Sequence, residues 1–366
     1  MKFTIERAPM LKMLGHMHRI VERRNTIPIL LNVLIRAEGE NLWLKSTDLD
    51  LQAEGQLAAD VKQQGTLTVP AHMLHDIVKK LPEGSQLSGE ATDKSLVIKS
   101  GRSRFTLQTL PDTDFPALSA ENLTHHFDMP TANLKLLIDK TSFALSNEET
   151  RYYLNGVYMH TPDYALRGVS TDGHRLSRID VDLPDGAAGM AGIIIPKKTV
   201  AEIAKLCADI SGQVSISVGA TKIRLAFGSL TLTSKLIDGT FPDYNRVIPA
   251  RNPHKATLGL AEFRSAIDRV SAVTSERGNR VKCSFVPGKL TLSVENPDGG
   301  SAVEEIEADY SGPVLETAYN ARYLLDILTV LDSDTCAINL AEAGSPALIA
   351  SRDGARHVIV LMPVRV

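Results

Sequence analysis

Apolar residues recur at helical spacing near the start of the chain and at two later places. Met10, Leu14 and Met17 follow one another at intervals of four and three, which puts them on one side of a helix. Helical spacing also occurs at Leu134, Leu137 and Ile138, with intervals of three and one, and at Phe263, Ile267 and Val270, with intervals of four and three. We therefore predict an amphipathic helix at each of the three places.

A second helix is predicted downstream of each first one, directly after a short apolar strand. The three stretches read VPAHMLHDIVKKLP from Val69, IPKKTVAEIAKL from Ile195 and YNARYLLDILTVL from Tyr319. Proline at the first two openings fits its tolerance in a first helical turn. Further strands are predicted after these helices, in RFTLQTLPDTDFPAL, LTSKLIDGTFPDYNRVIP and HVIVLMPVRV.

Polar turns between the two helices give the pattern a constant period. They read STD at 46–48, STD at 170–172 and ENPD at 295–298, which are 124 and 125 residues apart. Phe-Pro pairs at 115–116 and 241–242 lie 126 residues apart. Order and spacing agree, so we predict an α+β chain of three repeats: residues 1–125, 126–253 and 254–366. In each repeat, two helices should pack on one face of an antiparallel sheet.

Formal charge is distributed unevenly over these elements. The six predicted helices (10–24, 69–81, 131–140, 195–206, 261–277 and 319–331) together carry +7, whereas the whole chain carries −3. Everything outside the helices therefore carries −10, so helices on a common face would present a basic surface suited to a polyanion. The candidate cations are Lys12, Arg19, Arg23, Arg24, Lys79, Lys80, Lys135, Lys140, Lys197, Lys198 and Lys205. A solvated helix face is the alternative, because such faces often carry lysine and the third repeat adds no net charge.

Composition bounds the class of protein. The chain has 366 residues, 43% of them hydrophobic and 23% charged, and no apolar run approaches the roughly 20 residues that cross a bilayer. Its opening, MKFTIERAPMLK, alternates charged and apolar residues, unlike a secretory signal, which favours the cytoplasm. Cys207, Cys283 and Cys336 are odd in number and far apart, so we interpret them as buried thiols.

Asp172, Gly173, His174 and Arg175 are consecutive, and a histidine beside an aspartate can be an oriented general base. A hydrolase built on Asp172 and His174 is therefore one alternative. No Ser, Cys or metal-ligand set recurs around the pair at a recognisable spacing, which favours a structural role for His174 and no catalytic residue. His16 and His18 should point to different helix faces, whereas His72 and His75 could share one. Because no third ligand accompanies His72 and His75, the sequence predicts no metal site and no cofactor.

Several stretches resemble one bacterial family. MKFTIER, TIPIL, GRSRFTLQTLP, RYYLNG, TDGHRL, TSKLIDGTFPDY and MPVR, spread over all three repeats, are similar to the beta subunits of DNA polymerase III, the beta sliding clamps. The resemblance implies a head-to-tail homodimer of three-domain crescents, closed into a ring around duplex DNA. Such a ring tethers the replicative polymerase without reading sequence. A monomeric nucleic-acid-binding repeat protein is the alternative that the basic helices leave open.

The resemblance also implies three groups of site residues. For DNA contact it implies Arg24, Tyr152, Tyr153, Lys197 and Lys198. For a pocket that takes short peptide tails of polymerase, clamp loader and repair proteins it implies Leu154, Thr171, Gly173, His174, Arg175, Leu176, Pro242, Arg246, Val247, Val360, Met362, Pro363 and Val364. For the dimer interface it implies Arg102, Arg104, Phe105 and Leu107 facing Ala272, Val273, Glu304 and Glu305 of the partner copy.

Departures from the family pattern qualify these implications. Glu148 is an acid where the family has a polar residue that contacts DNA, and it would repel phosphate. His72 and Met73 occupy a helix start that is basic in other members. Ala272 and Val273 are small, so less apolar area would be buried at that point of the dimer interface.

Overall fold

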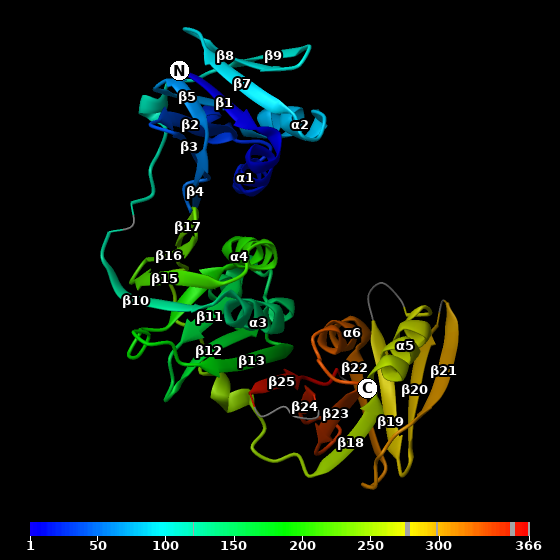
Figure 1. Cartoon of the computed structure of the whole chain (residues 1–366). Coiled ribbons are helices and arrows are strands. Elements are labelled where there is room, and N and C mark those ends of the chain that lie inside the picture. Colours follow the sequence, from blue (N-terminus) through cyan, green and yellow to red (C-terminus); the bar gives the residue numbers. More distant parts are fainter. Residues whose placement is uncertain (120, 275–278, 298, 352–355, 365–366) are drawn as a thin grey trace. The chain divides into compact units, whose positions relative to one another are not determined.

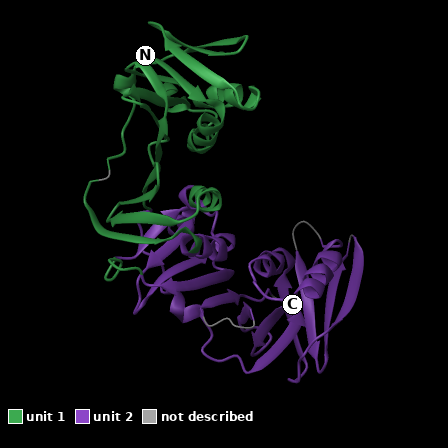
Figure 2. Ribbon diagram, viewed as in Figure 1, with its two compact units in different colours: residues 1–132, 184–190, 201–236 green, residues 133–183, 191–200, 237–366 purple. Residues whose placement is uncertain are grey.

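The computed structural model of the chain describes residues 1–119, 121–274, 279–297, 299–351 and 356–364. They form two compact units (Figure 2). Unit 1 comprises residues 1–132, 184–190 and 201–236, and unit 2 comprises residues 133–183, 191–200 and 237–366. The second repeat is thus divided between the units.

The three repeats share one order of elements (Figure 1). In each repeat, one strand leads into the first helix, several strands follow, the last of these leads into the second helix, and three strands complete the repeat. The first repeat comprises β1 (Lys2–Glu6), α1 (Arg7–Ile20), β2 (Asn32–Glu38), β3 (Asn41–Thr47), β4 (Leu51–Ala58), β5 (Asp60–Gln63), β6 (Gly65–Pro70), α2 (Ala71–Lys80), β7 (Gln86–Ala91), β8 (Ser95–Ser100) and β9 (Ser103–Gln108). The second comprises β10 (Leu123–Pro130), α3 (Thr131–Thr141), β11 (Gly156–His160), β12 (Ala165–Thr171), β13 (Arg175–Asp182), β14 (Ile193–Pro196), α4 (Lys197–Asp209), β15 (Gln213–Gly219), β16 (Lys222–Phe227) and β17 (Leu230–Lys235). The third comprises β18 (His254–Gly259), α5 (Leu260–Ser271), β19 (Arg280–Val286), β20 (Lys289–Asn296), β21 (Gly300–Glu307), β22 (Leu315–Asn320), α6 (Ala321–Thr329), β23 (Thr335–Leu340), β24 (Ala347–Ser351) and β25 (His357–Leu361).

All six predicted helices are confirmed, and the residues that predicted the first helix of each repeat are buried. α1 packs beside α2, and α5 beside α6 (Figure 1). Pro70 and Pro196 end the strands before α2 and α4, so each stands one position ahead of its helix. α5 ends at Ser271, before the predicted end at 277, and residues 275–277 of that prediction lie outside the described residues. Asp298 of the third polar turn also lies outside them.

The prediction of one sheet per repeat was wrong. Each repeat divides its strands between two sheets, and neighbouring repeats share a sheet. One eight-stranded sheet has the order β10-β15-β16-β17-β4-β3-β2-β6, and the other has the order β14-β11-β12-β13-β25-β24-β23-β18. The remaining sheets are β5-β1-β7-β8-β9 and β21-β20-β19-β22. The shared sheets are continuous because β4 pairs antiparallel with β17, and β13 with β25.

The cores are apolar and include the cysteines. In the third repeat, α5 and α6 bury Phe263, Ile267 and Leu324 against the strands, together with Cys283 and Cys336. Burial raises the pKa of both thiols to about 12, which keeps them protonated. Cys207 is also buried, so the prediction of three buried thiols is confirmed.

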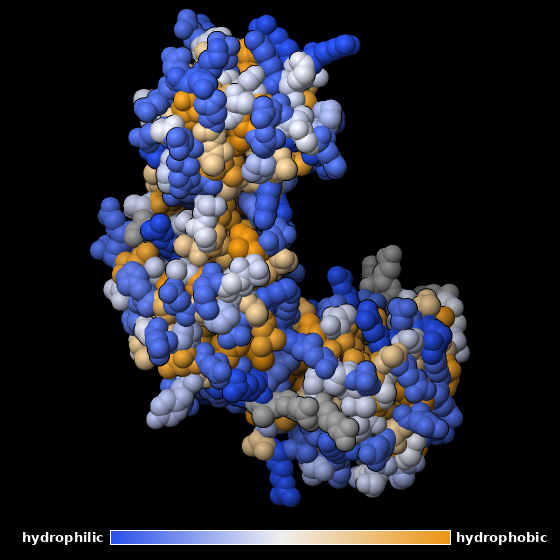
Figure 3. Space-filling view, in the orientation of Figure 1, coloured by the Kyte–Doolittle hydropathy of each residue, from blue (hydrophilic) through white to orange (hydrophobic). Residues whose placement is uncertain are grey.

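Among the described residues, no helix is both long enough and apolar enough to span a membrane. Hydrophilic residues cover much of the face shown in Figure 3, with hydrophobic residues interspersed.

Candidate DNA, partner-peptide and dimer interfaces

The turn at residues 171–175 is held by its own side chains. The Asp172 carboxylate accepts hydrogen bonds from the backbone N–H of His174 at 2.9 Å and of Arg175 at 3.0 Å. Thr171 Oγ accepts from the Gly173 N–H at 3.1 Å and donates to the Arg175 carbonyl. Gly173 has φ +87°, which a residue without a Cβ adopts at least cost. The Thr-Asp-Gly sequence therefore encodes the turn locally.

His174 is not oriented as a general base. The Asp172 carboxylate bonds to backbone N–H groups and to the Arg175 guanidinium, at 3.1 Å from Nε. The His174 side chain is exposed, with its ring centre 6.0 Å from that of Tyr323. The geometry supports the structural role predicted for His174.

The structure brings the turn together with the C-terminal strand. β13 pairs with β25, and the Met362 N–H donates to the His174 carbonyl at 2.8 Å. Leu154, Leu176 and Val360 are buried in one apolar cluster with Phe241 and Tyr244. Of the other predicted pocket residues, Gly173, His174, Pro242, Arg246, Val247 and Met362 are exposed, and Thr171, Pro363 and Val364 are half-buried. The predicted pocket residues thus comprise a buried apolar cluster and an exposed rim, which includes His174, Val247 and Met362.

Sequence reasoning missed the residues that hold the segment Pro242–Val247 in place. The Tyr244 ring is buried in that cluster, and its hydroxyl lies 3.1 Å from both Arg167 Nη1 and His160 Nε2. Arg167 in turn donates two hydrogen bonds to Asp180. Burial, with a contribution from Arg167, lowers the pKa of His160 to about 4. The one signal in the sequence for a cross-strand pair of Arg167 with Asp180 was the alternation of side chains between the two faces of β12 and β13.

Four of the five predicted DNA contacts gather in unit 2. Tyr152 and Tyr153 lie on a short 3₁₀ helix, Glu149–Leu154, and Lys197 begins α4, with its N–H donating to the Asn155 carbonyl at 3.0 Å. Lys197 Nζ also donates to Asn147 Oδ1, and Tyr152 is 52% exposed. Arg24, the fifth predicted residue, is exposed in unit 1.

Glu148 is paired with a cation. Arg151 Nε donates to Glu148 Oε2 at 2.7 Å, and this hydrogen bond lowers the pKa of the Glu148 carboxyl. Its charge is therefore largely balanced locally, and its repulsion of phosphate is weaker than the sequence indicated. The Arg151 charge is balanced by the same pair, so it adds little attraction.

Several basic side chains counted in the charge argument are engaged within the protein. Arg19 and Lys205 both pair with Glu202, and Lys135 pairs with Asp139. Lys140 is 7% exposed, donates to the Val330 carbonyl and pairs with Asp332, so its assignment to a DNA-facing surface was wrong. Formal charge along a helix overstates the basic surface because it ignores such partners.

Five of the eight predicted dimer residues lie on two edge strands. Phe105 and Leu107 belong to β9, at one edge of the five-stranded sheet, and Glu304 and Glu305 belong to β21, at one edge of the four-stranded sheet. Arg102 and Arg104 are exposed at or beside the β8–β9 turn, and Ala272 and Val273 follow α5. Leu107 is 2% exposed, so its side chain fills the core of its own repeat. Glu304 pairs with Arg269, and Glu305 with Lys289.

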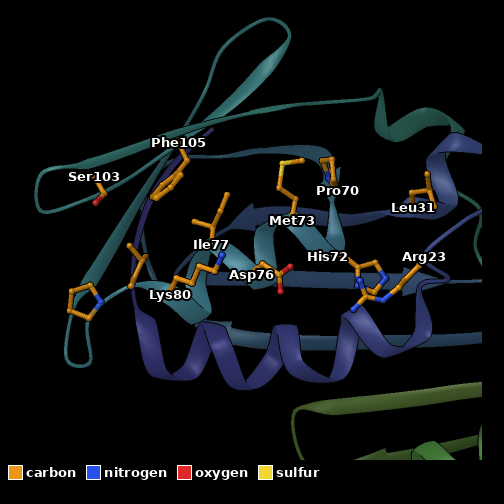
Figure 4. A pocket seen from close by; sticks show the side chains of 12 residues that line it. Arg23, Leu31, Pro70, His72, Met73, Asp76, Ile77, Lys80, Ser103 and Phe105 are labelled. Carbon is orange, nitrogen blue, oxygen red and sulfur yellow. The ribbon is translucent and has the colours of Figure 1, made fainter.

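A pocket of about 870 Å³ lies beside β9 (Figure 4). Phe105 lines it together with Met73, Ile77 and Leu81 from the α2 region, and Arg23, Asp76 and Lys80 add charge around it. Met73 is 53% exposed. Ile77 on α2 and Leu81 just after it were not predicted as site residues, although their apolar character three and seven positions after Leu74 was visible in the sequence.

The histidines cluster without forming a metal centre. His16 is buried next to Arg19, whereas the His18 ring stacks on His75 at 3.9 Å between centres, so the two do point to different faces. His72 lies edge-on to His18 at 5.6 Å. Among the described residues, no group of three His, Cys, Asp or Glu side chains could hold a metal ion.

Three repeats of one order of elements that share sheets define a clamp-type scaffold. Models of the N-terminal, central and C-terminal domains of the DNA polymerase III beta subunit match residues 1–119, 128–243 and 245–365. The chain belongs to this family, and its three repeats are three tandem clamp domains.

Relatives match along their whole length. The beta sliding clamp of Caulobacter vibrioides is 46% identical, and that of Pseudomonas aeruginosa is 38% identical, each with 100% of both chains covered. The crystal structure of the sliding clamp from Bartonella birtlesii, bound to griselimycin, superposes with a TM-score of 0.98 at 47% identity over 100% of both chains. The chain is accordingly a DNA sliding clamp for the polymerase, and the hydrolase alternative is excluded.

Proposed function

We propose that this clamp works in the cytoplasm as a head-to-tail homodimer that closes around duplex DNA. The observation that carries the proposal is the pairing between repeats. β4 pairs with β17 between the first and second repeats, and β13 pairs with β25 between the second and third. In the same order of elements, β21 corresponds to β4 and β13, and β9 corresponds to β17 and β25.

β9 and β21 are therefore the two strands of this type that end a sheet. An edge strand presents unpaired N–H and C=O groups that can template pairing with another chain. If β9 of each copy pairs with β21 of the other copy, the dimer contains two further junctions of the kind that joins the repeats within one chain. Such a heterologous contact closes into a ring when the rotation per copy fits. The pocket beside Phe105 would receive Ala272, Val273 and the 68% exposed Val303 of the partner copy. We place the domain boundaries near residues 125 and 253.

The dimer is tested by placing a charge at the proposed contact. Phe105→Asp should give monomers of about 40 kDa in light scattering at micromolar concentration, because the carboxylate would be buried unpaired against an apolar partner. Leu107 is unsuited to this test, because truncating it would also open a cavity in its own repeat. Tyr164→Asp, at a 92% exposed aromatic on the β11–β12 turn, is the matched control and should stay dimeric. A Phe105→Asp protein that still scatters as a dimer would contradict the assignment.

The proposed DNA contacts are Arg24, Tyr152, Tyr153, Lys197 and Lys198. Loose contacts to phosphate suit sliding, since they position a duplex without reading its sequence. After loading, the clamp should be retained longer on nicked circular DNA than on linear DNA with free ends. Equal loss from both would refute encirclement.

The contribution of individual cations is measured by salt dependence. Changing Lys197 and Lys198 to Ala should reduce the slope of log affinity against log salt by about 1 for each phosphate that the protein no longer neutralises. Changing the exposed pair Lys94 and Lys99 at the β7–β8 hairpin removes the same charge and should leave that slope unchanged.

We further propose that replicative polymerase, clamp loader and repair proteins bind through short peptides on the pocket between turn and tail. The buried apolar cluster of Leu154, Leu176 and Val360, together with the exposed Val247 and Met362, supports an apolar ligand, and burial of a few aliphatic side chains suggests affinity of about micromolar. Met362→Ala combined with Val247→Ala should weaken a labelled polymerase-tail peptide in fluorescence anisotropy without changing the melting temperature. Tyr164→Ala serves as the control, and unchanged affinity in the double variant would place the pocket elsewhere.

A further inference from the structure

Arg175 differs from the other predicted pocket residues because its charge lies inside the protein. The residue is 9% exposed. Its Nε donates to Asp172 Oδ2 at 3.1 Å, and its Nη1 donates to Asp326 Oδ2 at 2.7 Å. Its guanidinium carbon lies 4.3 Å from the ring centre of Tyr323 and 5.4 Å from that of Phe143.

These partners come from different repeats. Asp172 and Phe143 belong to the second repeat, whereas Tyr323 and Asp326 lie on α6 of the third. A guanidinium suits this position, because its fixed fork of donors reaches both carboxylates while its flat faces lie against aromatic rings. A guanidinium already engaged by two anions has little capacity left to bind a peptide carboxylate.

We propose that Arg175 is a positioning residue that braces α6 against the 171–175 turn and so sets the geometry of the peptide pocket. The proposal rests on the peptide-binding function proposed above. Tyr323 joins the brace to the rim, since its ring also lies near His174. His174 accepts the Met362 N–H through its carbonyl, and Val364 N–H donates to Ala318 just ahead of α6. Loss of the brace would therefore loosen the turn and the C-terminal tail together.

Asp326→Asn tests the brace without altering a predicted pocket residue. It removes the anion on α6 and keeps the shape of the side chain. We expect the polymerase-tail peptide to bind about five- to tenfold more weakly, which corresponds to about 1 to 1.4 kcal/mol. Asp334→Asn, at an exposed carboxylate just beyond α6, removes the same charge and should bind the peptide as the unmodified protein does.

Arg175→Gln separates the brace from direct recognition. If Arg175 acts as a brace, Arg175→Gln should weaken binding equally for a peptide with a free C-terminal carboxylate and for one with an amidated C-terminus. Adding Asp326→Asn should then cause no further loss of peptide affinity. A loss confined to the peptide with the free carboxylate would mean that Arg175 contacts the ligand, which would overturn the proposal.

Amide hydrogen exchange gives a readout that needs no peptide. Asp326→Asn should speed exchange at Met362 and Val364 and leave β15–β17 in unit 1 unchanged. Unchanged exchange at Met362, with affinity within about twofold of the unmodified protein, would refute the brace. If the unmodified protein binds no peptide, the proposed pocket fails, and the exchange rates alone then decide whether the brace exists.

Discussion

The turn at 47–51 in unit 1 and the turn at 171–175 in unit 2 have the same hydrogen bonds. Asp48 Oδ1 accepts from the N–H of Asp50 and Leu51 at 2.9 and 2.7 Å, and Thr47 Oγ accepts from Leu49 and donates to Leu51. Asp172 and Thr171 do the same in unit 2. The first turn contains no histidine, so these hydrogen bonds stabilise the turn itself and do not orient a histidine.

The two turns differ in their remaining side chains. The first has Leu49, Asp50 and Leu51 where the second has Gly173, His174 and Arg175. Each leads into a strand that joins two repeats, β4 to β17 in one case and β13 to β25 in the other. The backbone thus builds the junction twice, and substitution of side chains turns the second junction into the candidate peptide site.

The largest difference between the two turns should appear when each aspartate is removed. Asp172→Ala removes the acceptor of two backbone N–H groups and also one of the two carboxylates that hold the buried Arg175. We expect a loss of about 2 to 4 kcal/mol. Asp48→Ala also removes the acceptor of two backbone N–H groups but leaves no buried guanidinium without its carboxylate, and it should cost about 1 to 2 kcal/mol.

Thermal melting of both variants measures the comparison, with local hydrogen exchange to locate the change. Equal losses at Asp48 and Asp172 would show that the Arg175 pair adds nothing to the second turn.

Acid should weaken the second junction more than the first. His357 on β25 lies 3.0 Å from Ser177 Oγ, and burial, with Lys140 nearby, lowers its pKa to about 4. The unfolded chain then binds more protons between pH 6.5 and about 4, so stability is complete above pH 6.5 and falls as pH drops through that window. The fall should reach at most about 2 kcal/mol at pH 5.

The position equivalent to His357 in the first junction is Leu230, which does not titrate. Leu230 on β17 lies opposite Gly55, and His357 on β25 lies opposite Ile179. Exchange of β25 amides should therefore quicken between pH 6.5 and 5 more than exchange of β17 amides, after correction for intrinsic rates. His357→Gln should remove most of that difference. If the difference persists in His357→Gln, another group is responsible.

The smallest effect is expected from the backbone of the two turns. Leu49 has φ +80° and Gly173 has φ +87°, a conformation that costs a residue with a Cβ roughly 1 to 2 kcal/mol. Leu49→Gly should therefore stabilise the first turn by at most about 1 kcal/mol, because glycine also has a more disordered unfolded state.

Gly173→Ala should destabilise the second turn by about 1 to 2 kcal/mol, since a Cβ there would also lie 2.6 Å from Arg151 Nη1. Melting temperatures that move in the same direction for both substitutions would contradict this interpretation of the turns.

Local features were predictable from the sequence. Apolar spacing predicted the helices, and their buried faces are Met10, Leu14 and Met17 in the first repeat and their counterparts in the others. The Thr-Asp-Gly turn was readable because its hydrogen bonds join residues at most four positions apart. Both kinds of signal depend on neighbours along the chain, so a period in the sequence becomes a period in the structure.

Only the tertiary structure decided which strands pair between repeats and which charges are free. The pairing of β4 with β17 joins residues about 180 positions apart, and no local pattern specifies such a partner. Arg175 and Lys140 have the same formal charge as a surface lysine, yet contacts with α6 and the residues just after it bury both. Whether a cation faces DNA or braces two repeats depends on the carboxylates, carbonyls and rings that folding brings around it, because burying a charge is tolerable only where such partners are in place.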